Sequence, residues 1–275
     1  MSNQGEPPRP RTLAAGELLP GVRNAIAVTS AKGGVGKSTV AVNLALSLAA
    51  SGARVGLLDA DIYGPSLPLL MGVRQEPTIT PAGKIRPLSK EGVELMSIGF
   101  VTGEDAPVIW RGPLLGQAVQ QFLSQVEWGE LDYLLLDLPP GTGDIPLTLS
   151  QTVELSGVVV VTTPQEVALQ DVERGIAMFR KVEVETLGLI ENMSYYLCPQ
   201  CQARHEIFGH GGGREAARQL GIEFFGELPL EAAICAAGDQ GRPIALAAPD
   251  SPVGRAFADI AAKLEAAVRR LASPL

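Results

Sequence analysis

The sequence lacks several features that would place it in a specialised class of protein. No apolar run approaches the ~20 residues of a membrane-spanning helix, and residues 1–21 lack the apolar centre of a secretory signal. Basic residues are not in excess: 22 Lys and Arg stand against 30 Asp and Glu, a formal net charge of -8. Charge therefore gives no general attraction to nucleic acid or anionic lipid. These absences predict a cytoplasmic protein without a membrane or nucleic-acid partner.

Aromatic residues and cysteines are also scarce, at 5% aromatic residues and three cysteines in 275 residues. Few aromatics leave the core to Val, Leu, Ile and Ala, which is typical of parallel sheets covered by helices. Cys198 and Cys201 form a Cys-x-x-Cys pair, which in a reducing compartment favours metal or redox chemistry over a structural disulfide. Cys235 stands apart in a helical stretch, and we expect it to be a small buried residue.

What the sequence does contain is a regular alternation of β-rich and helical segments. Strands are expected at residues 25–30, 54–58, 93–98, 133–137, 157–163, 185–190 and 223–228. Helices are expected at residues 37–51, 114–126 and 167–182 and along the last 25 residues. Repeated strand–helix units predict an α/β fold, a doubly wound and mostly parallel sheet with helices on both faces in a single domain.

Some segments depart from this alternation. Residues 1–22 are rich in proline with little apolar periodicity, and we expect a mobile leader before a domain over 23–275. Residues 63–92 hold several Pro and Gly, which predicts an excursion above the strand ends. Residues 193–212 read as a polar loop that carries the cysteine pair. The apolar stripe of the last helix fits core packing, and a membrane-surface helix is the second interpretation.

A glycine-rich segment follows the first predicted strand and opens the first predicted helix. It reads Ala31-Lys32-Gly33-Gly34-Val35-Gly36-Lys37-Ser38-Thr39. This is the context of a phosphate-binding loop, in which glycines let backbone N–H groups face the phosphates and the helix N-terminus adds its dipole. We expect residues 32–39 to bind nucleotide, with Lys37 on the β- and γ-phosphates and Ser38 on Mg²⁺. Ala31 replaces the first glycine of the strict pattern but is small enough to keep the cradle.

Lys32 is a second lysine at the start of this loop, and it resembles the signature of the deviant Walker A ATPases related to MinD and ParA. The resemblance implies that Lys32 contacts phosphates of a neighbouring subunit's nucleotide, so that two copies sandwich ATP. A cation delivered across an interface would stabilise charge on the transferred phosphoryl group, as an arginine finger does. Lys32 is therefore a candidate catalytic residue, and a solvated lysine at the loop edge is the alternative.

Polar side chains follow several of the predicted strands. Asp137 ends an apolar run in the Walker B pattern, and we expect it to hold Mg²⁺ through water. In the resembled subgroup, the position of Asp61 orients the attacking water and that of Asp59 lies near the metal. Each of these two could instead be a turn or helix-capping residue. Asn192 matches the subgroup's adenine-reading asparagine, with a turn-forming Asn as the alternative.

The cysteine pair has the spacing to chelate one metal centre but cannot complete a site alone. Structural zinc takes about four protein ligands and a [4Fe–4S] cluster about four cysteines. In a two-fold dimer, two copies of Cys198 and Cys201 could meet on the axis and supply four thiolates. The alternative is zinc within one subunit, with His205 or His210 as further ligands. A thioredoxin-like redox pair fits less well, because such motifs open a helix.

Several motifs in order resemble the Mrp/ApbC family of iron–sulfur carrier ATPases. They are the phosphate loop and residues 59–66, 110–113, 137–144, 191–194 and 198–213, and the similarity runs from about residue 21 to 251. The resemblance implies a homodimer that binds ATP, hydrolyses it slowly and carries a bridging [4Fe–4S] cluster to apo-proteins, with a cluster assembly scaffold as a further partner. Two other functions stay open: a MinD- or ParA-like positioning ATPase, and a nucleotide-dependent zinc-binding module. The acidic charge and the cysteine pair favour the carrier over the positioning ATPase.

Overall fold

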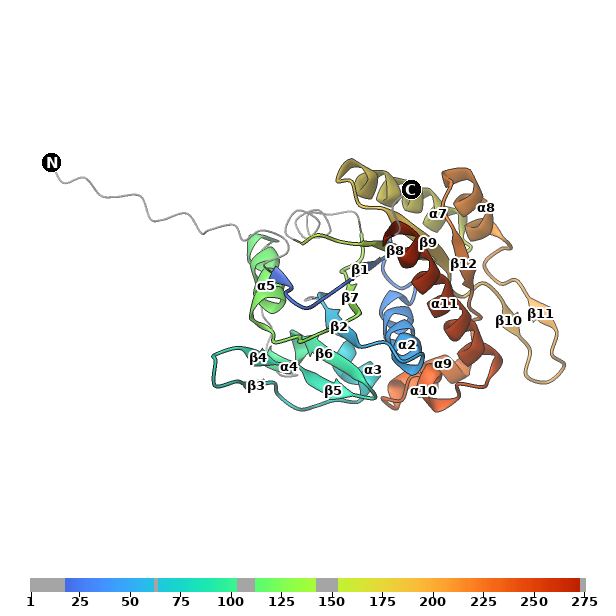
Figure 1. Ribbon diagram of the computed structural model, residues 1–275. Helices are drawn as coiled ribbons and strands as arrows, with labels where there is room; N and C mark the ends of the chain where they lie inside the picture. The colour runs from blue at the N-terminus through green and yellow to red at the C-terminus, as the bar shows by residue number, and fades with distance from the viewer. Residues whose placement is uncertain (1–17, 62–63, 103–111, 142–152, 273–275) are drawn as a thin grey trace.

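The computed structural model describes residues 18–61, 64–102, 112–141 and 153–272 (Figure 1). Eight strands form one sheet in the order β12-β9-β8-β1-β7-β2-β6-β5. Their bounds are β1 (Ala25–Thr29), β2 (Val55–Asp59), β5 (Leu88–Lys90), β6 (Val93–Ser97), β7 (Tyr133–Asp137), β8 (Gly157–Thr162), β9 (Thr186–Glu191) and β12 (Phe224–Glu227). Every neighbouring pair is parallel except β5 with β6. The mostly parallel sheet predicted from the apolar runs is confirmed.

Helices cover both faces of the sheet because its central strands are apolar on both sides. In β1, Ile26 and Val28 pack with α2 (Lys37–Ala50) and α11 (Pro252–Ala272), whereas Ala25 and Ala27 face the side that carries α5 (Gly112–Gln125). On that second side, α7 (Glu166–Lys181) and α8 (Gly212–Leu220) pack over β8 and β9. Shorter helices within the described residues are α3 (Leu67–Met71), α4 (Gly99–Thr102), α9 (Ala232–Asp239) and α10 (Ile244–Ala247). The predicted doubly wound arrangement is confirmed.

The last helix is a core helix. The side chains of Phe257, Ile260 and Leu264 on α11 are buried in the same cluster as the apolar residues of α2. Core packing therefore accounts for the apolar stripe, as the first of the two interpretations expected. Among the helices of the described residues, none has the length and apolar character that crossing a bilayer requires.

The packed domain reaches back further than the expected boundary at residue 23. Leu18 and Leu19 are only 2% and 8% exposed. The N–H of Leu131 donates to the carbonyl of Gly21, and the N–H of Arg23 donates to that of Leu131. Residues 18–22, assigned to the leader from their composition, therefore pack with the domain, because two buried leucines and the hydrogen bond at Gly21 hold them beside β7.

The segment over residues 63–92 is more regular than the expected excursion. It holds helix α3, a hairpin of β3 (Thr78–Ile79) and β4 (Ile85–Arg86), and then β5. Strand β5 turns back on β6 through Glu91 and Gly92, both with positive φ, and adds an antiparallel edge to the sheet. A tight turn of this kind suits a two-residue hairpin connection. Strands of two or three residues are too short to show a periodic pattern, so the sequence analysis missed them.

Candidate nucleotide site and cysteine hairpin

The phosphate loop joins the buried strand β1 to helix α2, as predicted. Gly34 and Gly36 have φ of 79° and 78°, a left-handed conformation that glycine adopts without steric cost. Gly36 is the N-cap residue of α2, and no side chain caps that helix end. The N–H groups of the first turn and the positive end of the helix dipole are therefore available to an anion.

Lys37 and Asp137 form a buried ion pair at the carboxyl ends of adjacent strands β1 and β7. Lys37 Nζ lies 2.5 Å from Asp137 Oδ1 and 3.2 Å from Ser38 Oγ. The two residues are only 6% and 3% exposed. Burial raises the pKa of Asp137, while the charge of Lys37 and the hydrogen bonds of Lys37 and Ser38 act in the opposite direction. The structure thus brings together three residues that the sequence analysis assigned to phosphate and Mg²⁺.

Asp59 ends β2 and stands opposite Asp137 in the parallel register. Its carboxylate accepts hydrogen bonds from the N–H groups of Asp61, Ser66 and Leu67 and from the hydroxyl of Ser97. Burial and the nearby charge of Asp137 raise the pKa of Asp59 to about 7, against the lowering effect of these hydrogen bonds. This geometry matches the turn and capping interpretation of Asp59, and a role near Mg²⁺ stays a prediction.

Asp61 faces the same site as Asp137. Its backbone N–H is held by Asp59, its side chain is partly exposed, and its charge contributes to raising the pKa of Asp137. That position is compatible with the predicted contact to an attacking water.

The motif over residues 137–144 is described only as far as Gly141. There, the N–H of Gly141 donates to the carbonyl of Ser30. Of the motif over residues 110–113, the first two residues lie outside the described part of the chain.

Lys32 is not free at the edge of the loop. Its Nζ lies 3.2 Å from Asp171 Oδ2 on α7, and Asp171 also pairs with Arg174 at 3.0 Å. The Lys32 side chain is 37% exposed, so the pair with Asp171 is a surface interaction of small net energy. Sequence reasoning missed Asp171, because a single acidic residue on an amphipathic helix carries no signal of a partner far away in the chain.

Asn192 follows β9 and touches the phosphate loop directly. It is 7% exposed, and its Nδ2 donates to the carbonyl oxygen of Val35 at 2.8 Å. A cavity of about 150 Å³ opens beside it. The lining of this cavity includes Gly36, Thr39, Asn192, Pro229, Glu231 and Cys235. Cys235 was expected to be buried but is exposed at this cavity, because α9 presents it to the side rather than to the core.

The cysteine pair lies on a β-hairpin instead of an irregular loop. Strands β10 (Tyr196–Leu197) and β11 (Arg204–His205) pair in antiparallel fashion, and the hairpin stands out beside β12 and α8 (Figure 1). The N–H of Cys198 donates to the carbonyl of Ala203, and the N–H of Gln202 donates to that of Cys198. Cys198 is partly exposed and Cys201 is exposed. The hairpin therefore offers both thiols to the outside.

The two thiols are close together but have no further metal ligand beside them in the part of the chain that the structure describes. Among the described residues, no group of three or more His, Cys, Asp or Glu side chains could hold a metal ion. His210 instead pairs with Glu206 at 2.6 Å, and the ring of His205 lies beside that of Tyr196. Hydrogen bonds from the N–H groups of Cys201 and Gln200 and from the Cys201 thiol lower the pKa of the Cys198 thiol. A lower pKa favours the thiolate, which is the form that binds metal.

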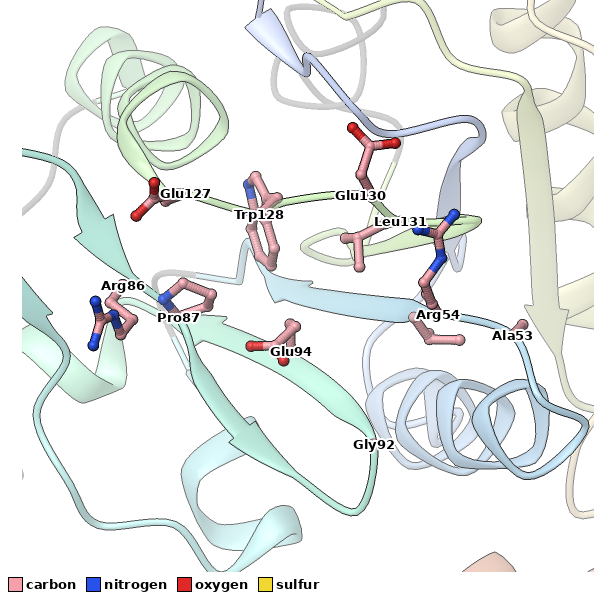
Figure 2. A pocket seen from close by; sticks show the side chains of 11 residues that line it. Ala53, Arg54, Arg86, Pro87, Gly92, Glu94, Glu127, Trp128, Glu130 and Leu131 are labelled. Carbon is pink, nitrogen blue, oxygen red and sulfur yellow. The ribbon is translucent and has the colours of Figure 1, made fainter. Parts of the chain in front are cut away.

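A second cavity lies away from the phosphate loop. It has a volume of about 430 Å³ and lies at the amino ends of β2, β6 and β7 (Figure 2). Glu94 and Trp128 face it together with Arg54, which also donates to Asp132. Ligands of open parallel sheets bind at the carboxyl ends of the strands. The site of interest is therefore the phosphate loop and not this cavity.

The fold and the phosphate loop define a P-loop NTPase. A nucleotide-binding protein from Archaeoglobus fulgidus, solved in complex with ADP, is 42% identical, with a TM-score of 0.74 over 83% of this chain and 90% of that chain. The cell division ATPase MinD from Pyrococcus furiosus has a TM-score of 0.67 over 88% of this chain and 98% of its own, and at 20% identity this likeness shows the fold alone.

The family is narrower than this class. A family model described as "ParA: NUBPL iron-transfer P-loop NTPase" matches residues 21–265. The iron-sulfur cluster transfer protein NUBPL from Dictyostelium discoideum is 49% identical over 90% of this chain and 77% of its own length. The iron-sulfur cluster carrier protein from Aquifex aeolicus is 50% identical over 91% and 69%. The chain belongs to the NUBPL iron-transfer P-loop NTPase family, and the resemblance to iron–sulfur carrier ATPases is confirmed.

Proposed function

We propose that this protein is an ATP-dependent iron–sulfur cluster carrier that holds a bridging [4Fe–4S] cluster between two copies of the chain and passes it to apo-proteins. The observation that carries the proposal is the exposed hairpin with two thiols and no third ligand among the described residues of its own chain. Such a half-site needs a second half, and a two-fold dimer supplies it. The names of the relatives in the same family support the same cargo.

The nucleotide site would bind Mg²⁺·ATP through the residues around the phosphate loop. The hydroxyl of Ser38 and the carboxylate of Asp137 are oxygen donors, which fit Mg²⁺ and would not hold a soft metal as well. Bound Mg²⁺ would neutralise charge on the phosphates. Lys37 would exchange Asp137 for a phosphate oxygen, and Asn192 would face the adenine from the cavity beside it.

Hydrolysis would need residues from both copies. Asp61 would orient the attacking water, and Asp59 would keep the loop of Asp61 in place through its four hydrogen bonds. Lys32 would leave Asp171 and reach the phosphates of the partner's nucleotide, where a cation stabilises the developing charge. Such an arrangement makes hydrolysis depend on association and gives a slow ATPase as long as the chain is a monomer.

The cluster is the cargo of the protein. Cys198 and Cys201 from each copy would supply the four thiolates that a [4Fe–4S] cluster takes. Their exposure would let a recipient thiol reach the cluster, and a scaffold protein would load it by the same route. A reducing compartment such as the cytoplasm would keep the thiols available.

Anaerobic reconstitution with iron and sulfide tests the proposal. We expect about two cysteine pairs per cluster, a broad visible absorbance and a dimer in solution, all lost in Cys198→Ser. His210→Gln is the matched control: it changes a possible zinc ligand on the same hairpin and should keep the iron. Iron that persists in Cys198→Ser, or a strictly monomeric protein loaded with both nucleotide and cluster, would overturn the proposal. Zinc bound in place of iron, and lost in His210→Gln, would instead identify a zinc-binding module.

A further inference from the structure

The phosphate loop and both ends of the cysteine hairpin meet at two consecutive residues, Glu191 and Asn192, where β9 ends. We propose that this junction couples nucleotide binding to the position of the hairpin, with Glu191 as the positioning residue. The inference rests on the proposed function, since it connects the two sites that the function needs.

On one side of the junction, Asn192 contacts the phosphate loop. Its Nδ2 donates to the carbonyl of Val35 in a buried hydrogen bond. The same amide packs against Gly36, where an added Cβ would clash with Nδ2. Asn192 is thus hydrogen-bonded to one loop residue and in tight contact with the next. A shift of Val35 and Gly36 as the loop closes on phosphates must move this side chain or break its hydrogen bond, which is expensive at a buried position.

On the other side, Glu191 fastens both ends of the segment that carries the cysteines. Its Oε1 accepts a hydrogen bond from Ser194 Oγ at 2.6 Å, and its Oε2 accepts one from the N–H of Gly213 at 2.5 Å. Ser194 precedes β10, and Gly213 lies in the first turn of α8 after β11. One carboxylate therefore joins the chain just before the hairpin to the chain just after it.

Glu191 cannot move without these partners, because it is fully buried. Its exposed fraction is 0%. A buried carboxylate that loses a hydrogen bond is left without a partner, and this costs much of the free energy of its desolvation. The close approach also depends on glycine, since a Cβ at Gly213 would lie 2.7 Å from Oε2. The ends of the hairpin and Glu191 should therefore move as one unit.

The backbone between the two sides is short and fixed at its flanks. The N–H of Asn192 donates to the carbonyl of Thr162 on β8, and the N–H of Ser194 donates to that of Leu228 after β12. Met193 between them has φ of 55°, in the left-handed region that a non-glycine residue adopts at a cost. With so few free torsions, a displacement of Asn192 passes to Glu191 and Ser194 rather than being absorbed by the turn.

Amide hydrogen exchange of the metal-free, full-length protein tests the coupling. The peptides over residues 195–212 are followed by mass spectrometry with and without saturating Mg²⁺·ADP, after the Kd of each variant has been measured. In the wild type, we expect nucleotide to change hairpin exchange by ~3-fold or more. In Glu191→Gln, the Kd should stay within ~2-fold while the hairpin response is lost, because an amide N–H₂ replaces one of the two acceptor oxygens. A merely structural glutamate would alter exchange equally with and without nucleotide.

Glu227→Gln is the matched control. Glu227 ends β12 beside Glu191 and contacts the hairpin through Arg204 at 3.2 Å, but it has no link to the phosphate loop through Asn192. Its variant should keep the nucleotide response. If Glu191→Gln does not fold, Ser194→Ala removes one of the two hydrogen bonds to Glu191. It should reduce the logarithm of the nucleotide-induced change in hairpin exchange rate by about half.

Two results would overturn the coupling: a wild-type hairpin that does not respond to bound nucleotide, or variants of Glu191 and Ser194 that respond like the wild type. Neither result would contradict the proposed carrier function, as long as the protein still takes up iron on Cys198 and Cys201. Failure of iron uptake in the wild type would instead refute the carrier function, and the exchange data on metal-free protein would still stand.

Discussion

The phosphate site and the cysteine hairpin are built in opposite ways. Lys37 and Asp137 are only 6% and 3% exposed and lie at the carboxyl ends of the central strands of an eight-stranded sheet. Cys198 and Cys201 lie on a hairpin of two-residue strands, where Cys198 is partly exposed and Cys201 is exposed. The residues of the nucleotide site are therefore part of the core, so a single substitution there changes both nucleotide binding and the stability of the fold. The cysteines are open to a second copy or a recipient and contribute little to the fold.

The largest expected effect comes from breaking the buried pair. Lys37→Met leaves the Asp137 carboxylate buried without its cation, and we expect the free energy of unfolding to fall by ~3–5 kcal/mol. Nucleotide binding should be lost as well, because Lys37 is the cation of the phosphate loop. Denaturant unfolding and titration with a fluorescent nucleotide measure the two effects.

A double variant separates stability from binding. Lys37→Met together with Asp137→Asn removes both charges, so it should recover part of the lost stability without recovering nucleotide binding. An unchanged unfolding midpoint in Lys37→Met alone would show that the buried ion pair does not stabilise the fold. The phosphate site and the cysteine hairpin would then not differ in their contribution to stability.

Lys32 lies between the two extremes, at the phosphate loop but on the surface. Lys32→Ala should keep nucleotide binding and change the free energy of unfolding by less than ~1 kcal/mol, because its pair with Asp171 is exposed. Single-turnover hydrolysis should slow by ~10²–10³-fold, the effect of one group that stabilises transition-state charge. Arg174→Ala removes the other partner of Asp171 and should leave hydrolysis within ~2-fold of the wild type. Normal hydrolysis by Lys32→Ala would refute the role of Lys32 in the partner's site.

Asp59 gives the phosphate site a pH dependence in the metal-free protein. Its pKa is about 7 in the fold, above the ordinary value of 3.8, so the folded state holds a proton that the unfolded state has released. The stabilisation is complete at low pH and is lost as pH rises through about 7. Between pH 6 and 8 this amounts to ~1 kcal/mol of unfolding free energy. Unfolding of the wild type and of Asp59→Asn at both pH values measures it. A wild type that is equally or more stable at pH 8 contradicts the prediction.

The same contrast explains what could be predicted from the sequence. The central strands and the phosphate loop carry strong local patterns: continuous apolar runs, and glycines at the start of a helix. Lys37 and Asp137 are far apart in the chain, yet their proximity was predictable because the carboxyl ends of parallel strands meet at one edge of a sheet. In the core, the buried segments are therefore the ones with a recognisable sequence pattern.

The sequence analysis was weaker where tertiary contacts decide the structure. Strands of two residues, such as β10 and β11, have no period to recognise, so the hairpin was expected to be a loop. The contacts of Asp171 with Lys32 and of Glu191 with Gly213 involve residue types that are common on helices and strand ends. The exposure of Cys235 depends on how α9 is oriented against its neighbours, which composition does not specify.

The smallest expected effect on stability belongs to the cysteine hairpin, and it is the sharpest contrast with Lys37. Cys198→Ser and Cys201→Ser replace exposed atoms on a surface hairpin, so each should change the free energy of unfolding by less than ~0.5 kcal/mol. Nucleotide affinity should also stay unchanged, while iron binding after reconstitution is lost. The stability is measured on metal-free protein, since a bound cluster would stabilise the fold by mass action. A loss of several kcal/mol in either variant would mean that the thiols support the fold from within one chain, and the shared site between two copies would lose its physical basis.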